Sequence, residues 1–151
     1  MKATVINHSP YPLKQVRTAV RWTLRELDAD MHIVAVGIRD TKEISHHGRF
    51  YGDAEENSPR VWDEWMGAIS PNGVRHLCVG RVPHSPIGLH HRGFKSGPPP
   101  INPHDWIESL VCIVAHEATH LRQYLRQGKP RFSEVEAEWA EHRLLRRWRE
   151  Q

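Results

Sequence analysis

Cysteine is scarce in this sequence, which contains only Cys78 and Cys112 among its 151 residues. Two cysteines form no disulfide framework and are too few for a zinc knuckle. Each lies in a short apolar run, where a cysteine usually behaves as a small buried hydrophobic side chain. The sequence therefore favours a protein of a reducing compartment.

Long apolar runs are also missing. No stretch approaches the roughly 18–20 consecutive apolar residues that a membrane span needs, and the N-terminal residues lack the apolar segment of a signal peptide. These absences predict a cytoplasmic protein without a membrane partner. The length of 151 residues and the charged fraction of 26% are typical of one folded domain, which we assign to residues 1–151.

Histidine, in contrast, is abundant, with 12 residues in the chain. A neutral imidazole is a good metal ligand, but a histidine-rich chain also produces chance motifs. The net charge of +3 is mildly basic. It reflects in part the run from Arg143 to Arg149, which fits a solvated helix face better than a nucleic-acid contact.

Apolar side chains that recur every three or four residues predict three amphipathic helices, over residues 13–27, from Asn102 or His104 to about Gln127, and over residues 133–149. Gly128 and Pro130 end the second helix, because neither residue type continues a helix easily. Ser133 and Glu136 have the spacing of a capping box at the start of the third helix.

Short β-branched or apolar segments predict a small sheet of three or four strands, at residues 3–6, 33–38, 49–52 and 74–82. Residues 83–103 are rich in proline, glycine and histidine, and we expect a long ordered loop or flap there. The expected fold class is α+β, with an N-terminal helix, the small sheet and two C-terminal helices.

The second predicted helix contains the motif His116-Glu117-Ala118-Thr119-His120, or HExxH. Histidines four residues apart on a helix point the same way, so both imidazoles can bind one zinc ion. The glutamate beside the first histidine does not ligate, but it lies close enough to take a proton from a zinc-bound water. The sequence therefore predicts one Zn²⁺ per chain, with His116 and His120 as ligands and Glu117 as the catalytic base.

A catalytic zinc site needs a third protein ligand and one open position. On the third predicted helix, Glu134, Glu138 and Glu141 share one side, whereas Glu136 points elsewhere. Glu134 lies next to the apolar stripe that packs on the second helix, so we assign it as the third ligand. Glu138 and Glu136 remain alternatives.

These residues resemble the gluzincin group of zinc peptidases, in which HExxH is followed by a helix that carries a glutamate ligand. The segment Glu134-x-x-Ala137-Glu138 is similar to the ExxA(D/N) pattern of the HtpX-type and ImmA/IrrE-type members. The resemblance covers about residues 104–148. It implies a minimal zincin-like fold, Glu134 as the ligand, and Glu138 as the residue that orients the first histidine. Glu138 is one methylene longer than the usual aspartate of that pattern.

The predicted function is that of a zinc metallopeptidase acting on a peptide or protein substrate. By analogy with zincins, an edge strand near residues 49–52 or 74–82 would pair with the substrate. The residue that stabilises the oxyanion stays open between Tyr51, Tyr124, His142 and the doublets His46/His47 and His90/His91. One alternative is a non-catalytic zinc-binding domain whose metal is structural or regulatory. Another is a protease-like domain acting on nucleic-acid-associated proteins.

Overall fold

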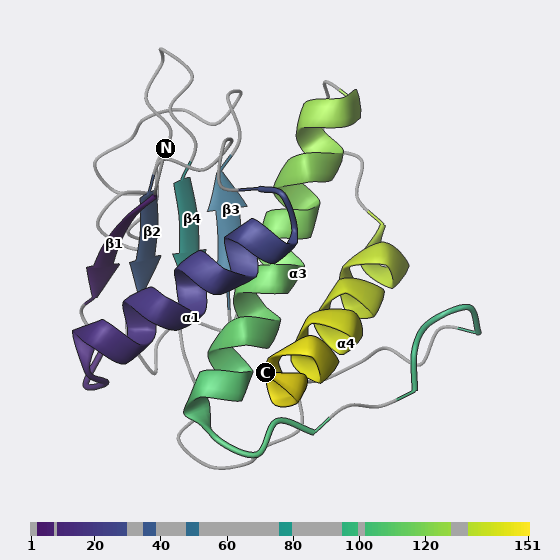
Figure 1. Ribbon diagram of the computed structural model, residues 1–151. Helices are drawn as coiled ribbons and strands as arrows, with labels where there is room; N and C mark the ends of the chain where they lie inside the picture. The colour runs from purple at the N-terminus through teal and green to yellow at the C-terminus, as the bar shows by residue number, and fades with distance from the viewer. Residues whose placement is uncertain are drawn as a thin grey trace.

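A computed structural model of the chain describes residues 3–7, 9–29, 35–38, 48–51, 76–79, 95–99, 102–127 and 133–151. In chain order these residues form β1 (Thr4–Asn7), α1 (Leu13–Glu26), β2 (Ala35–Ile38), β3 (Gly48–Tyr51), β4 (His76–Val79), α3 (Trp106–Gln127) and α4 (Glu134–Glu150) (Figure 1). The three predicted helices are present, and each described strand overlaps one of the segments predicted as a strand.

The predicted α+β class is wrong, because the regular structure is mostly helical. The helices have 14, 22 and 17 residues, whereas every strand has 4. Strand and helix also alternate at the start of the chain: β1 and β2 pair in parallel, with α1 as the connection between them. Two neighbouring parallel strands need a crossover connection of this kind. The sequence prediction missed it, because the apolar pattern of a single segment does not show in which direction the strand runs.

The strands form one sheet in the order β1-β2-β4-β3. The pairs β1–β2 and β2–β4 are parallel, and the pair β3–β4 is antiparallel. In this described sheet β3 is an edge strand, whereas β4 has neighbours on both sides. The helix α1 packs on β1 and α3 packs on β3 and β4, so two helices that touch each other cover one face (Figure 1).

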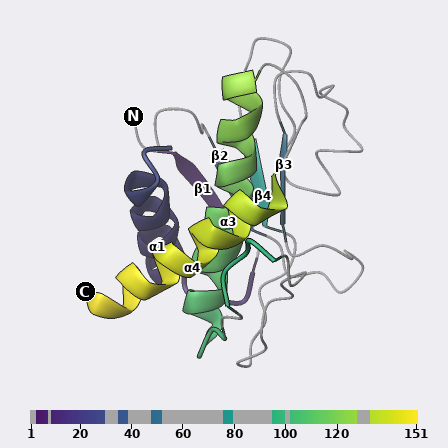
Figure 2. The same ribbon diagram turned by 90° about the vertical axis from the view of Figure 1, so that its right-hand side faces the viewer.

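The helix α3 is central to the packing, because it contacts α1, α4, β3 and β4. Its apolar side chains are excluded from water on several sides, among them Leu110, Val114 and Leu121, all with 0% exposure. Burying one such side chain contributes about 1.5–3 kcal/mol to folding. Figure 2 shows α4 crossing α3 on the side away from the sheet. The metal motif therefore lies on the helix at the centre of the described structure.

The N-termini of α3 and α4 are both capped by side chains, although not entirely as predicted. The helix α3 begins at Trp106 rather than at Asn102 or His104, with the Asp105 Oδ1 accepting a hydrogen bond from the Glu108 N–H at 2.9 Å. Ser133 caps α4 as predicted, its side chain accepting from the Glu136 N–H at 3.2 Å. The reciprocal half of the capping box is replaced, because the Ser133 N–H donates instead to Gln123 Oε1 at 3.1 Å.

Cys112 on α3 is fully buried and packs with Leu145 of α4. Burial raises the pKa of the Cys112 thiol well above its ordinary value. This agrees with the prediction of a small hydrophobic side chain. Within the described part of the chain, no helix is both long and apolar enough to cross a membrane.

An ion pair joins the start of α3 to the end of α4. The guanidinium of Arg149 donates to both carboxylate oxygens of Glu108, at 2.7 and 3.2 Å, and to the Asn102 carbonyl at 2.8 Å. Burial alone would raise the pKa of Glu108, but the hydrogen bonds from Arg149 and from the His104 N–H lower it below the ordinary value. The charged form of Glu108 is therefore stabilised in the folded chain.

We expect Arg149→Met to lower the free energy of unfolding by about 1–2 kcal/mol near neutral pH, since Arg149 is partly exposed and solvent screens the pair. Because the pKa of Glu108 is lowered on folding, this contribution is complete above the unfolded carboxyl pKa of roughly 4.3. It is lost as the pH falls through the folded value. Denaturant unfolding across this range measures both effects.

The matched control is Arg143→Met, which removes an exposed arginine from the same helix. It should change the free energy of unfolding by no more than about 0.5 kcal/mol. Equal losses in the two variants at every pH would contradict a specific role of the Glu108–Arg149 pair.

Candidate metal centre

His116 and His120 lie on successive turns of α3 and direct their imidazoles to the same place. Their Nε2 atoms are 3.0 Å apart. The side chain of His116 is 20% exposed to solvent, and that of His120 is 7% exposed. Both histidines therefore lie at the border between the core and the surface, where a metal can be reached from solvent.

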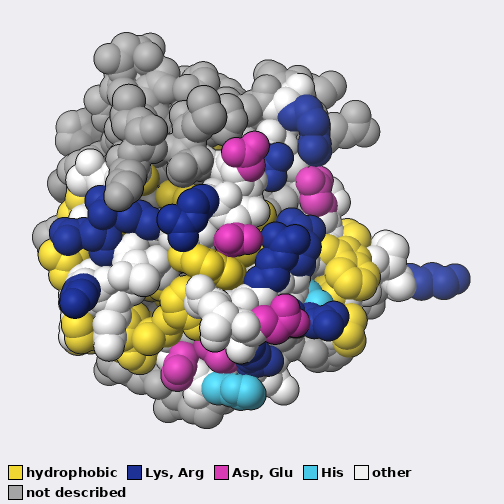
Figure 3. Space-filling model, in the orientation of Figure 1, with side chains coloured by type: hydrophobic (Ala, Val, Ile, Leu, Met, Phe, Trp, Pro, Cys, Tyr) yellow, Lys and Arg dark blue, Asp and Glu magenta, His cyan; other side chains and the backbone are white. Residues whose placement is uncertain are grey.

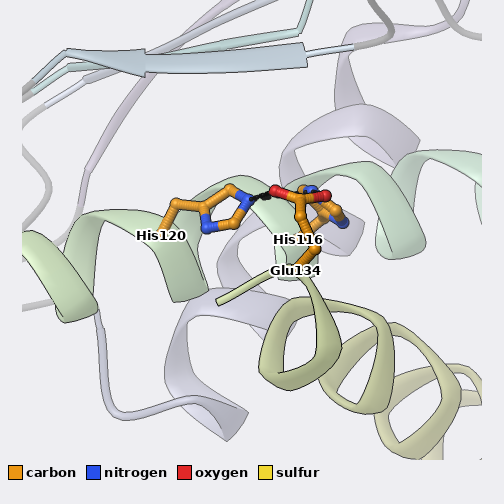
Figure 4. A group of neighbouring side chains, drawn as sticks. All are labelled: His116, His120 and Glu134. Atoms are coloured by element: carbon orange, nitrogen blue, oxygen red, sulfur yellow. Dashed lines mark hydrogen bonds and ion pairs between the residues drawn. The ribbon is translucent and has the colours of Figure 1, made fainter. Parts of the chain in front are cut away.

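The third donor comes from the first turn of α4. The Glu134 carboxylate reaches across to α3, with Oε1 2.7 Å from His120 Nε2 and Oε2 3.4 Å from His116 Nε2 (Figure 4). The ligand atoms of the three residues all lie within 4.8 Å of one another. His116, His120 and Glu134 thus form a group that could hold a metal ion.

The size of this triangle fits a small divalent metal ion. Donors held at 2.0–2.1 Å in tetrahedral geometry are separated by about 3.3 Å from one another. The three measured separations of 2.7, 3.0 and 3.4 Å lie close to that value. A metal ion therefore requires only a small outward adjustment of the side chains, and no backbone rearrangement.

The outer nitrogens of both imidazoles also have partners. The Nδ1 of His116 lies 3.1 Å from the Oε2 of Glu141, and the Nδ1 of His120 lies 3.0 Å from the Oε1 of Gln123. Contacts of this type orient a ligating histidine and raise its basicity. The resemblance assigned the partner of His116 to Glu138, which is also buried, but the structure places Glu141 against this nitrogen.

The position of Glu141 follows from helix geometry. It is two turns beyond Glu134 on the same side of α4, a rise of about 10 Å. The imidazole of His116 therefore lies between two carboxylates, with Nε2 toward Glu134 and Nδ1 toward Glu141.

The charges of the site are strongly coupled. Hydrogen bonds with His116 and His120 hold the pKa of Glu134 well below its usual range. Burial alone would lower the pKa of His116, but hydrogen bonds to Glu134 and Glu141 raise it to about 10. The carboxylates thus attract positive charge to this point.

Glu117, the predicted base, is adjacent in sequence but does not belong to the donor group. Its side chain is partly buried. Burial raises the pKa of Glu117, while the neighbouring charges of His116 and His120 oppose that shift.

The other candidates occupy different places. Glu136 is exposed and accepts hydrogen bonds from Gln123 Nε2 at 2.9 Å and Arg126 Nη2 at 3.3 Å, so it is not the ligand. The ring of His142 lies 5.8 Å from that of Trp139, and among the described residues the donor group does not include it. The remaining candidates, Tyr51, Tyr124, His46, His47, His90 and His91, have side chains outside the described part of the chain.

Two residues of the site were not assigned from the sequence. Glu141 shares a side of α4 with Glu134 and Glu138. That spacing alone does not show whether Glu138 or Glu141 contacts the first histidine. Gln123 lies three residues after His120 on the same face of α3. Its spacing was available as a signal, but glutamine is common on helices and its contacts with α4 depend on the tertiary fold.

No protein-family model, curated protein or solved structure matches this chain.

We expect Glu141→Leu to weaken zinc binding by about 10–100-fold, because the first histidine loses the carboxylate on its Nδ1. Glu138→Leu, which removes a buried carboxylate from the same helix, should weaken it less. Competition with a chromogenic chelator measures both affinities, and circular dichroism checks that each variant folds. A greater loss in the Glu138 variant would instead support the assignment implied by the resemblance.

Proposed function

We propose that this chain is a zinc-dependent metallopeptidase-type hydrolase that cleaves peptide bonds. The observation that carries the proposal is the convergence of His116, His120 and Glu134 on one point, with Glu117 beside the first histidine. Two imidazoles and one carboxylate are a ligand set of catalytic zinc sites. Three protein donors leave a coordination position for water or substrate, and the described residues supply no fourth donor to this group.

The donor set also explains why a cation is favoured here. Glu134 and Glu141 bring two carboxylates to the pair of imidazoles, at 2.7 Å from His120 and 3.1 Å from His116. In a partly buried site these negative charges need compensation. A divalent ion held by the three donors provides it, and the second carboxylate remains hydrogen-bonded to His116 Nδ1.

In the proposed reaction His116, His120 and Glu134 hold the metal. A bound zinc ion would polarise the scissile carbonyl and lower the pKa of a water molecule. Glu117 accepts a proton from the attacking water and then passes it to the leaving amine, as a general base followed by a general acid.

The sheet supplies one constraint on the substrate. Of the two segments expected to pair with an extended peptide, β4 already has strands on both sides, whereas β3 is at the edge of the described sheet. Since α3 packs against β3 as well as β4, a peptide along β3 would run near the helix that carries the motif. The proposed substrate is therefore an extended peptide or a protein segment.

A non-catalytic zinc domain is the main alternative, and it requires a closed coordination shell. His142, the described residue considered for that task, lies against Trp139 instead. A nucleic-acid-associated role depends on the arginines of α4. Arg147 pairs with Glu26 and Arg149 with Glu108, and the basic side chains in Figure 3 are interspersed with acidic and hydrophobic ones. Neither observation favours these alternatives.

We expect the purified protein to contain one zinc ion per chain. His116→Ala and Glu134→Ala should lose it, because each removes one of three ligands. Mass spectrometry of metal content after dialysis measures the stoichiometry. Glu150→Ala is the matched control, since it changes an exposed glutamate at the far end of the same helix. A folded wild type without stoichiometric metal would overturn the zinc site.

We expect Glu117→Gln to retain its zinc and to lose peptidase activity by about 10²–10⁴-fold, because glutamine cannot accept the proton. The assay uses an unstructured protein such as casein and a fluorogenic peptide library, with metal content measured on the same samples. Equal activity in wild type and variant would show that contaminating protease or another residue is responsible. A zinc-loaded wild type without activity on any substrate would support the non-catalytic alternative.

A further inference from the structure

Gln123 is a fully buried polar side chain next to the candidate metal centre. It lies on α3, one turn beyond His120, and its exposure is 0%. Burying an amide is unfavourable unless its donors and acceptor find partners. The burial of Gln123 therefore depends on the hydrogen bonds that its amide makes.

The amide of Gln123 has all of its hydrogen-bonding capacity in use. Its Oε1 lies 3.1 Å from the Ser133 N–H nitrogen and 3.0 Å from His120 Nδ1. Its Nε2 donates to the Ser133 carbonyl at 3.0 Å and to the Glu136 carboxylate at 2.9 Å. An amide offers two acceptor sites and two donors, so none remains.

The backbone of Ser133 determines which way this amide points. Its N–H can only donate and its carbonyl can only accept, so they fix Oε1 and Nε2 at their observed positions. A reversed amide would place two donors together and two acceptors together. The oxygen of Gln123 must therefore face His120.

This orientation has a consequence for the imidazole of His120. Because Gln123 Oε1 can only accept, the contact at 3.0 Å requires a proton on His120 Nδ1. The other ring nitrogen, Nε2, lies 2.7 Å from the Glu134 carboxylate, which is the length of a hydrogen bond. A metal ion that replaces the proton of that hydrogen bond leaves Nδ1–H in place, so the contact with Gln123 suits a ligand that binds through Nε2.

The same amide fixes the start of α4. Ser133 is the N-cap of that helix and directly precedes Glu134. Gln123 makes two hydrogen bonds to the backbone of Ser133, and it also contacts His120 Nδ1. It therefore connects the start of α4, where Glu134 lies, to the second histidine ligand. A single side chain therefore sets both the protonation of one ligand and the place of another.

We propose that Gln123 is a positioning residue of the metal centre, which orients the His120 ring through its Nδ1–H and anchors the first turn of α4 beside it. The inference rests on the proposed metal site for its function. Its geometric part concerns the protein alone and is tested separately.

The experiment compares wild type, Gln123→Met and Gln123→Glu by long-range ¹H–¹⁵N correlation spectra of the histidine rings. Spectra are recorded at one pH on the chain with and without added zinc. We expect a His120 Nδ1–H signal that is protected from solvent exchange in the wild type, because Gln123 Oε1 accepts this proton. In Gln123→Met this acceptor is lost, so the Nδ1–H signal should exchange faster and broaden.

Gln123→Glu separates positioning from general stability. Its carboxylate still accepts from His120 Nδ1, so the protected Nδ1–H signal should persist. It can no longer donate to the Ser133 carbonyl and it faces Glu136, so the denaturation midpoint should fall. Leu110→Ala is the control for simple destabilisation, because it truncates a buried side chain on α3 away from the site and should leave the Nδ1–H signal unchanged.

Zinc affinity provides the second measurement on the same four proteins. We expect Gln123→Met to bind zinc about 10–100-fold more weakly than wild type, with Gln123→Glu affected less and Leu110→Ala unaffected. An unchanged His120 Nδ1–H signal and an unchanged zinc affinity in Gln123→Met would overturn the inference. The expected loss of the protected signal in Gln123→Met, in a protein whose wild type binds no zinc, would contradict the proposed function while supporting the orientation of His120 by Gln123.

Discussion

The packing of α4 against α3 is the constraint on which the rest of this structure depends. It is fixed at one end by Arg149 and Glu108 and at the other by Gln123 and the Ser133 backbone. Between these ends, apolar side chains of both helices enter the core that α1 and the sheet complete. A metal site shared between two helices needs this rigidity, because a ligand displaced by a fraction of an ångström binds poorly.

Charge at the site is balanced within the same helix pair. The imidazole of His116 lies between Glu134 and Glu141, and both carboxylates come from α4. In the absence of a metal ion this arrangement favours a proton on His116 and raises its pKa. A metal ion and a proton therefore compete for the same electron pairs, which is the usual relation between metal binding and protonation.

The helices and the donor residues could be predicted from the sequence because their signals are local. The HExxH spacing places two imidazoles on one face of any helix, and Glu134 follows from its place beside an apolar stripe. The fold class could not be predicted in the same way. Four strands of four residues contribute little beside three long helices, and the parallel pairing of β1 with β2 depends on contacts between distant segments.

The side chains that can bind a metal could be recognised in the sequence, because helical periodicity fixes which residues share a face. The groups that surround these side chains depend on contacts between helices. Glu141 rather than Glu138 reaches His116 Nδ1, and Gln123 joins His120 to the start of α4. These partners lie 25 and 10 residues apart along the chain. Their meeting depends on how one helix crosses another, and no local pattern of residues encodes that crossing.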